Sequence, residues 1–330
     1  MDKKSKIEKI FLSICIPTKN QPRALQSTLD SILPQIKDFG VEIVVCDDSD
    51  KEESKSVIDS YNHKSIRYFK GKKGGFDEAI IFLTKEARGD YLIWFGDDLM
   101  EEGMIKKIKE LVYANADISF IWVNSCDKLN PKITAFKDNN DKFFNDRNEI
   151  IKKDIGLLAF MSSTIIKKEN ISDIICEAHK YSGLSLMSLF FVLGAISVGG
   201  RYYFIGHPYI ISDSKPSGEA RWYDSFQVHA INFYMVVKRF KGKFDKSAIK
   251  KSLSDKFARA WRAVIVERAM GLTTGFGSKS PKVFKMAKFY WTYPEFYIAL
   301  PLFLTPRPIL NFFYKYYRFL FRRREKIYSL

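Results

Sequence analysis

Two adjacent carboxylates end one of the most apolar stretches of the 330-residue sequence. The run GDYLIWFGDDLM (89–100) has the composition of a buried strand, and it contains Asp97 and Asp98 near its end. Two ionised carboxylates side by side repel each other and resist burial, so such a pair either opens into solvent or holds a cation. A divalent cation at Asp98, with the phosphate oxygens of a ligand completing its shell, would account for the pair.

Polar residues also end two earlier apolar runs. FLSICIPT (11–18) is followed closely by Asn20, and VEIVVCDD (41–48) ends in Asp48. In an open α/β sheet, ligands bind beyond the carboxyl ends of the strands. We therefore expect these polar residues to share one crevice with the carboxylate pair.

The elements that must position these residues alternate along the first 125 residues. Short apolar runs take turns with amphipathic segments, which predicts an α/β sheet with crossover helices. Asn20 can cap the first helix, Ser49 or Asp50 can cap the second, and a glycine loop ending at Gly75 precedes the third. The polar segment 127–150 predicts a loop or a hairpin excursion. The expected strands cover residues 11–18, 41–48, 65–70, 90–98 and 117–125.

The net charge of +16 is carried by the second half of the chain. Residues 1–150 hold 24 Lys and Arg against 26 Asp and Glu, whereas residues 151–330 hold 30 against 12. This asymmetry indicates that the C-terminal half meets an anionic partner, either membrane phosphates or nucleic acid. The aromatic content of 15% is high for a soluble protein and favours lipid contact for some of these side chains.

Several classes of site and compartment are disfavoured. The fingerprint GxGxxG and the phosphate loop GxxxxGK[ST] are absent, so the charge of a nucleotide must be neutralised by something other than a glycine cradle. The four cysteines are far apart, which fits buried thiols in a reducing compartment rather than zinc ligands or disulfides. The N-terminal MDKKSKIEKI lacks the apolar core of a signal peptide, so we expect a cytoplasmic active part.

Three motifs taken together resemble a known family. The stretches SICIPTKNQPRALQSTLDSIL, EIVVCDDSD and IRYFKGKKGGFDEAIIFLTKEARGDYLIWFGDDLM are similar, in order and spacing, to the inverting family 2 glycosyltransferases. The combination of GGFDEA with YLIWFGDD most resembles their abequosyltransferase-like branch, which builds bacterial surface polysaccharide. The resemblance covers residues 10–125 well and 155–215 weakly. It implies an α/β fold of the GT-A type, which binds a nucleotide sugar and has a mostly parallel central sheet.

The resemblance also implies a role for each matching position. Asp48 would hydrogen-bond the base of the donor nucleotide, and Asp97 would touch the ribose or the donor sugar. Asp98 would bind Mg²⁺ or Mn²⁺ bridging the diphosphate, and this cation would stabilise the departing nucleoside diphosphate. The remaining donor contacts would come from Pro17, Thr18, Asn20 and Gly75.

The sequence departs from the family pattern at two places. Leu99 stands where a third acidic residue often follows the pair, which leaves Asp98 as the direct protein ligand of the metal. An inverting enzyme also needs a general base for the acceptor hydroxyl, usually an Asp or Glu in the second half. The matching stretch AHKYSGLSLMSLFFVLGAISVGGRYYFIGHPYII contains no acidic residue. The candidates for the base are Glu177, His179 and Asp213. Within the acceptor half, Met161–Ser163 resembles a strand of the family.

The C-terminal tail is aromatic and basic. Its most apolar part, Phe296–Leu304, is far shorter than the about 20 residues that a spanning helix needs, and prolines interrupt the region. Ile309–Lys326 interleaves Phe and Tyr with Lys and Arg, which is typical of a helix in the membrane interface. Packing of this helix back onto the protein is the alternative.

These observations predict an inverting, metal-dependent glycosyltransferase that moves a sugar from a nucleoside diphosphate to a saccharide anchored by polyprenyl diphosphate. We expect a glycosyltransferase domain over 1–215, with a donor half at 10–125 and an acceptor half at 126–215, and a helical, basic, membrane-associating region over 216–330. The enzyme would be peripheral on the inner face of the cell membrane and would bind no nucleic acid. A sugar-1-phosphate nucleotidyltransferase and a non-catalytic basic protein that binds nucleic acid or membrane are the alternatives.

Overall fold

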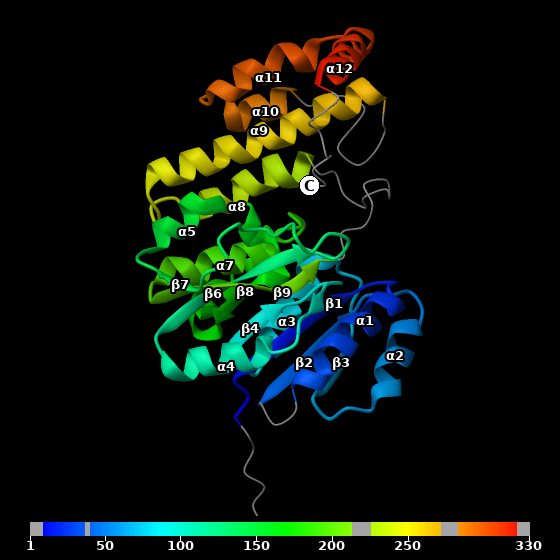
Figure 1. Ribbon diagram of the computed structural model, residues 1–330, viewed down its shortest axis with the longest axis vertical. Helices are drawn as coiled ribbons and strands as arrows, with labels where there is room; N and C mark the ends of the chain where they lie inside the picture. The colour runs from blue at the N-terminus through cyan, green and yellow to red at the C-terminus, as the bar shows by residue number, and fades with distance from the viewer. Residues whose placement is uncertain (1–8, 37–39, 213–225, 272–282, 322–330) are drawn as a thin grey trace, which may run out of the picture. The chain divides into compact units, whose positions relative to one another are not determined.

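The chain divides into two compact units, residues Met1–Ser214 and Lys215–Leu330. The computed structural model describes residues 9–36, 40–212, 226–271 and 283–321 (Figure 1). The first unit mixes helices with strands, whereas every regular element described in the second is a helix.

One nine-stranded sheet forms the centre of the first unit, in the order β3-β2-β1-β4-β8-β6-β9-β5, with β7 also paired to β9. The strands β3, β2, β1 and β4 are parallel neighbours, and β6 is parallel to β9. β8 runs antiparallel between β4 and β6, while β5 and β7 run antiparallel to β9. The predicted α/β class with a mostly parallel sheet is therefore confirmed. The bounds are β1 Leu12–Thr18, β2 Val41–Asp47, β3 Ile66–Lys70, β4 Tyr91–Trp94, β5 Leu99–Met100, β6 Ile118–Asp127, β7 Lys142–Phe144, β8 Thr164–Lys167 and β9 Arg201–Ser212.

Helices cover both faces of this sheet (Figure 1). Since side chains alternate along a strand, Ile93 packs with α1, α2 and α4 in one apolar cluster, while Trp94 points to the opposite face. On that face the Trp94 ring stacks on Phe191 of α7, with centroids 5.6 Å apart, and its indole N–H donates to Thr84 of α3. The helices are α1 Pro22–Ile32, α2 Glu53–Tyr61, α3 Phe76–Glu86, α4 Met104–Ala114, α5 Arg147–Asp154, α6 Ser172–Ile175 and α7 Met187–Val198. Short 3₁₀ turns are η1 Leu33–Gln35, η2 Leu157–Ala159, η3 Met161–Ser163, η4 Lys168–Ile171 and η5 Ala178–Tyr181.

Two expectations about individual segments meet different outcomes. The segment 127–150 is largely irregular and contains one short strand, β7, which pairs with β9 of the sheet. This agrees with the predicted loop or hairpin excursion. Cys15, Cys46 and Cys126 are buried, but Cys176 is exposed, so the expectation of four buried thiols is wrong for that residue. Cys176 ends the short helix α6 on the surface, where no apolar layer covers it.

The second unit contains a π-helical turn and five helices among its described residues. The ring of Tyr290 in α10 stacks on Phe257 of α9, with centroids 4.1 Å apart, and its hydroxyl donates to the Ala230 carbonyl. Within the described residues, a single helix long and apolar enough to span a membrane does not occur. Pro294–Leu304 and Arg307–Tyr316 meet that criterion only jointly, as a pair bent by 110°. The elements are η6 Gln227–Asn232, α8 Phe233–Arg239, α9 Lys246–Met270, α10 Val283–Tyr290, α11 Pro294–Leu304 and α12 Arg307–Phe321.

Candidate functional site

The carboxyl ends of β2, β1 and β4 bring the predicted residues to one edge of the sheet. The three strands are adjacent and parallel, and Thr18 is in register with Asp47. The backbone N–H of Asp48 donates to the carbonyl of Thr18 over 2.9 Å. Asp97 and Asp98 follow β4 at the same end, so the residues of all three strand ends lie along one edge of the sheet.

Asp48 holds the loop between β3 and α3. Its side chain is buried, with 6% of its surface exposed, and its two carboxylate oxygens accept the backbone N–H groups of Lys73 (3.2 Å) and Gly75 (3.1 Å). A β-carbon at Gly71 would lie 1.8 Å from Asp48 Oδ1, so the loop passes too close to the carboxylate for any side chain at that position. Gly75 has a φ of +83° and precedes the first residue of α3. The loop is therefore shaped around the carboxylate.

Asn20 joins the β1–α1 loop to the β2–α2 loop. Its backbone N–H donates to Ser49 Oγ over 2.7 Å, and its side-chain amide exchanges two hydrogen bonds with Asp50. The hydrogen bond from Asn20, assisted by Lys73, lowers the pKa of Asp50 below its ordinary value. These contacts cross-link two loops at the carboxyl ends of β1 and β2.

The predicted helix caps at these loops are wrong. Gln21 precedes α1 and Glu52 precedes α2, and the side chain of neither caps its helix. Asn20 lies in the left-handed region, with a φ of 54°, and its side chain is used by Asp50 instead. The polar groups of Asn20 and Ser49 thus bond across the two loops, which a local capping pattern does not reveal.

The two adjacent carboxylates have different environments. Asp97 is exposed, whereas Asp98 is 6% exposed and its Oδ2 accepts a hydrogen bond of 2.5 Å from the hydroxyl of Ser162. That hydroxyl also accepts the N–H of Gly96 over 3.0 Å, and the hydroxyl of Thr28 donates to the Asp98 carbonyl over 3.0 Å. The site thereby fixes one carboxylate and leaves the other accessible to solvent.

Ser162 comes from the acceptor half of the chain. Met161–Ser163 forms the 3₁₀ turn η3 before β8, so the expectation of a strand there is wrong. From this turn the hydroxyl of Ser162 reaches Asp98, which follows the neighbouring strand β4. The sequence does not reveal that Ser162 pairs with Asp98, since the two residues are 64 positions apart and no local pattern links them.

The donor atoms at the β4 end are hard oxygens. Within the described residues, groups of three or more His, Cys, Asp or Glu side chains arranged to hold a metal ion are absent. A protein-only metal cage is therefore not formed by this part of the chain. Mg²⁺ and Mn²⁺ accept carboxylate oxygen, and Mg²⁺ in particular keeps waters or phosphate oxygens in its shell, so Asp98 and Asp97 fit a cation shared with a ligand.

The structure places the three candidates for the base differently. Glu177 directly precedes η5 and is half-buried. His179 lies against α3, where Nδ1 is 3.2 Å from Glu78 and Nε2 is 3.0 Å from the ammonium of Lys85. An ammonium group can only donate, so Nε2 is the accepting nitrogen and Nδ1 carries the proton toward Glu78. Asp213 lies outside the described residues.

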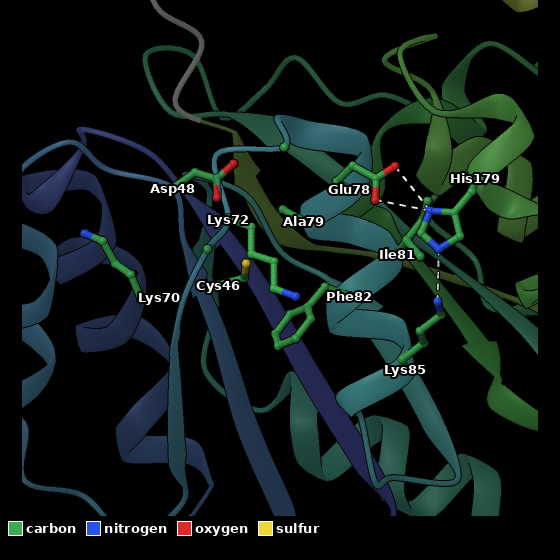
Figure 2. A pocket seen from close by; sticks show the side chains of 12 residues that line it. Cys46, Asp48, Lys70, Lys72, Glu78, Ala79, Ile81, Phe82, Lys85 and His179 are labelled. Carbon is green, nitrogen blue, oxygen red and sulfur yellow. Dashed lines mark hydrogen bonds and ion pairs between the residues drawn. The ribbon is translucent and has the colours of Figure 1, made fainter.

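A pocket of about 280 Å³ extends from Asp48 along α3 to His179 (Figure 2). Cys46 and Phe82 provide apolar surface, and the ammonium groups of Lys72 and Lys85 line it. The hydroxyl of Ser182, and then His179, lower the pKa of Glu78 against the opposing effect of its burial. The remaining lining comes from Lys70, Gly71, Gly74, Glu78, Ala79 and Ile81.

Comparison with known families decides the identity of this fold. Residues 13–171 match the family described as "Glycosyl transferase family 2". Residues 13–171 form a glycosyltransferase family 2 domain. The matched span includes all three strand ends and the Ser162 turn, and it sets aside the nucleotidyltransferase and the non-catalytic alternatives.

This glycosyltransferase is similar in sequence to an abequosyltransferase. Abequosyltransferase RfbV of Salmonella typhimurium is 27% identical over 236 residues, a match that covers 64% of this chain and 71% of the relative. The predicted resemblance to the abequosyltransferase-like branch is thus confirmed. An uncharacterised glycosyltransferase of Rickettsia felis is 36% identical over 90 residues, which cover 27% of this chain and 15% of that protein.

Solved structures confirm the GT-A-like fold of the glycosyltransferase. A structure of TarS residues 1–349 from S. aureus has a TM-score of 0.57 at 15% identity and matches 89% of this chain and 80% of that one. The same TarS fragment in complex with UDP-GlcNAc has a TM-score of 0.59 at 14% identity, over 92% of this chain and 87% of that one. The mannosyltransferase PcManGT from Pyrobaculum calidifontis, in complex with GDP-Man and Mn²⁺, has a TM-score of 0.52 at 12% identity. This match covers 95% of this chain and 88% of the mannosyltransferase chain.

Proposed function

We propose that this glycosyltransferase moves a sugar, with inversion, from a nucleoside-diphosphate sugar to a lipid-linked saccharide in the synthesis of a bacterial surface polysaccharide. The observation that carries the proposal is the pair formed by the buried Asp98 and the exposed Asp97, at the same sheet edge as Asp48. The name of the abequosyltransferase relative supports the transfer of a sugar.

The donor nucleotide would lie against the ends of β1 and β2. The Asp48 carboxylate accepts one backbone N–H at each oxygen, and a carboxylate oxygen has a second lone pair that an N–H of a base can use. Thr18 and Gly75 are hydrogen-bonded to Asp48, and Pro17 and Asn20 lie within two residues of Thr18 along the chain, so these four residues would supply the remaining donor contacts. The structures of TarS with UDP-GlcNAc and of PcManGT with GDP-Man, which share the fold, support such a donor.

The chain's own residues would orient the diphosphate and its sugar. When bound, Mg²⁺ or Mn²⁺ supplies positive charge against the departing nucleoside diphosphate, and Asp98 would hold it. Ser162 keeps the Asp98 carboxylate in one orientation, and Asp97 would contact the ribose or the donor sugar. The acceptor hydroxyl would attack the anomeric carbon from the opposite side while a base takes its proton.

Glu177, His179 and Asp213 remain the proposed sources of that base. In the described structure the accepting nitrogen of His179 faces Lys85, so His179 would act as a base only after the flexible Lys85 side chain moves aside. Glu177 is a carboxylate, which can accept a proton at either oxygen.

We further propose that the second unit holds the enzyme on the inner face of the cell membrane. Aromatic and aliphatic side chains of α11 and α12 are exposed, among them Tyr297, Ile298, Phe312 and Phe313, while Leu310 of α12 is buried. One face of α12 therefore packs in the unit as the alternative reading predicted, and its other face remains available to lipid. Contact with the bilayer surface would bring an acceptor anchored by polyprenyl diphosphate to the enzyme.

Two measurements with nucleoside diphosphates test the donor proposal: the heat of binding by titration calorimetry, and the shift in melting temperature. We expect one nucleoside diphosphate to raise the melting temperature in the presence of Mn²⁺, and to do so less in EDTA, because a ligand that binds only the folded state stabilises it. A sugar carrying the same nucleotide should then be transferred to a lipid-linked acceptor. The absence of heat and of any melting shift with every common nucleoside diphosphate and Mn²⁺ would overturn the proposal.

A further inference from the structure

Asp77 makes contacts that the proposed mechanism does not use. It is the second residue of α3, only 4% of its surface is exposed, and its carboxylate accepts the backbone N–H groups of Ser185 (2.7 Å) and Met187 (3.1 Å). Met187 is the first residue of α7 and Ser185 lies two residues before it, while Leu186, the residue that directly precedes the helix, provides no side-chain cap. Asp77 therefore caps a helix that lies more than a hundred residues further along the chain.

This cap places a negative charge between two helix N-termini. The first N–H groups of a helix lack partners within the helix, and the N-terminal end of the helix dipole is positive. Asp77 belongs to the first turn of α3, and its carboxylate lies against the N-terminus of the twelve-residue helix α7. The N-termini of both helices therefore favour the negative charge of this carboxylate. Burial opposes ionisation and raises the pKa of Asp77, while hydrogen bonds from Ser185 and Met187 act in the other direction.

The segment that Asp77 holds has an unusual backbone. Ser185 adopts a φ of 58°, in the left-handed region that residues other than glycine rarely occupy. Such a conformation persists only where the surrounding contacts determine it, and the Ser185 N–H is bonded to Asp77 Oδ2. Removing this acceptor would leave the first turn of α7 with a buried N–H group and without a reason to keep this conformation.

The first turn of α3 also contacts the donor side of the site. The N–H of Gly75, two residues before Asp77, donates to Asp48, and Glu78 contacts His179. A continuous set of contacts thus runs from Asp48 through the start of α3 to residues 179–187. In this way one helix turn sets the position of the acceptor-half segment relative to the loop around Asp48.

We propose that Asp77 is a positioning residue for sugar transfer, which fixes the segment Gly183–Met187 against α3 so that the acceptor side of the site faces the bound donor. The inference rests on the proposed transfer function. Asp77 does not touch the reactants, and it acts through the backbone of Ser185 and Met187. Its loss should therefore lower kcat more than it weakens donor binding, because misplacement of about 1 Å near reacting groups costs on the order of a hundredfold in rate.

The test compares Asp77→Asn with Glu42→Gln in the full chain. The amide of Asn keeps one acceptor but places an NH₂ group against the second N–H donor. Glu42 is also a buried carboxylate with hydrogen bonds, to Ser13, Arg67 and the Arg88 backbone, but it lies at the amino end of β2. It therefore controls for the loss of a buried carboxylate away from the site.

Three quantities are measured for each variant at equal distance below its melting temperature. For Asp77→Asn we expect faster amide hydrogen exchange over residues 183–187, a kcat lower by about tenfold or more, and a nucleoside-diphosphate Kd within about threefold of wild type. Glu42→Gln should leave the exchange of residues 183–187 and kcat unchanged. Asp77→Glu, which keeps the charge but lengthens the side chain, replaces Asp77→Asn if that variant does not fold, with the same expected kcat loss.

Two results would overturn the positioning role. One is a wild-type kcat in Asp77→Asn or Asp77→Glu, and the other is an equal kcat loss in Glu42→Gln, which would make the effect one of general stability. A failure of the proposed function is distinguishable, because it would show as absence of transfer by the wild-type enzyme with every donor.

Discussion

Asp98 is a carboxylate whose burial needs compensation. Its surroundings provide the hydroxyl of Ser162 at 2.5 Å, while its neighbour Asp97 is exposed. A buried carboxylate beside a second carboxylate is costly unless positive charge or hydrogen bonds balance it. Under the proposed donor binding, a cation shared with the diphosphate would add positive charge beside Asp98.

The variant Asp98→Asn should abolish most of the transfer activity and leave the fold intact. Its side-chain oxygen can still accept from Ser162, but the negative charge for a cation is lost. We expect transfer from a radiolabelled donor to fall by about a hundredfold or more, on the scale of other losses of transition-state charge stabilisation. Asp90→Asn is the matched control, since Asp90 lies just before the same strand and pairs with Lys9 on the surface. A wild-type rate for Asp98→Asn would rule out the metal role.

At the scale of elements, the loop between β3 and α3 is built around one carboxylate. Asp48 binds Lys73 and Gly75 through their backbones, and Gly71 passes so close that a β-carbon has no space. The loop connects the donor side of the site with the start of α3. A change in the shape of this loop should therefore weaken donor binding while the structure of the sheet is preserved.

The variant Gly71→Ala should weaken donor binding. The added β-carbon would overlap Asp48 Oδ1, so either the carboxylate or the loop must move, and such overpacking costs about 1–3 kcal/mol of unfolding free energy. If half of that cost opposes donor binding, the Kd of the nucleoside diphosphate rises by about two- to tenfold, measured by titration calorimetry. Gly242→Ala, at a glycine of positive φ in the second unit with open space around it, is the control for backbone strain alone. Unchanged donor affinity in Gly71→Ala would separate this loop from the donor site.

At the scale of the whole molecule, charge and aromatic content are concentrated in the second half. Residues 151–330 hold 30 Lys and Arg against 12 Asp and Glu, and α11 and α12 expose several large apolar side chains. Phe312 is 67% exposed and Phe313 is 61% exposed, on a helix that also carries Lys315. Basic residues attract anionic headgroups, while exposed aromatic rings enter the interface, so the two features act together.

The double variant Phe312→Ser/Phe313→Ser should bind membranes less tightly. We expect wild-type protein to float with vesicles of anionic phosphatidylglycerol, and the partition of the double variant to fall by about tenfold or more, because each buried Phe side chain contributes about 1.5–3 kcal/mol. Tyr113→Ser is the matched control, since Tyr113 is an equally exposed aromatic residue of the first unit. Equal flotation of all three proteins, or flotation of none, would contradict a membrane-binding face on α12.

Local patterns in the sequence were sufficient for the sheet and for the polar strand ends. The apolar runs of β1 and β2 fold as predicted, because a strand buried on both faces needs apolar residues at nearly every position. The expected strand 90–98 is shorter in the structure, since β4 ends at Trp94 and the polar end of the run leaves the sheet. Asp48, Asp97 and Asp98 follow these strands, and parallel strands place their carboxyl ends together. The caps at Asn20 and Ser49 failed because both side chains have partners on another loop, which competes with the local capping bond.

The sequence by itself determined the fold class, the family and the edge at which chemistry can occur, since periodicity and residue order act over short distances. Only the tertiary structure decided that Ser162 orients Asp98 and that Asp77 caps α7, because these partners are 64 and 108 or more residues apart. Their hydrogen bonds depend on how two halves of one sheet pack, and a buried carboxylate finds its donors only after that packing has brought them within about 3 Å.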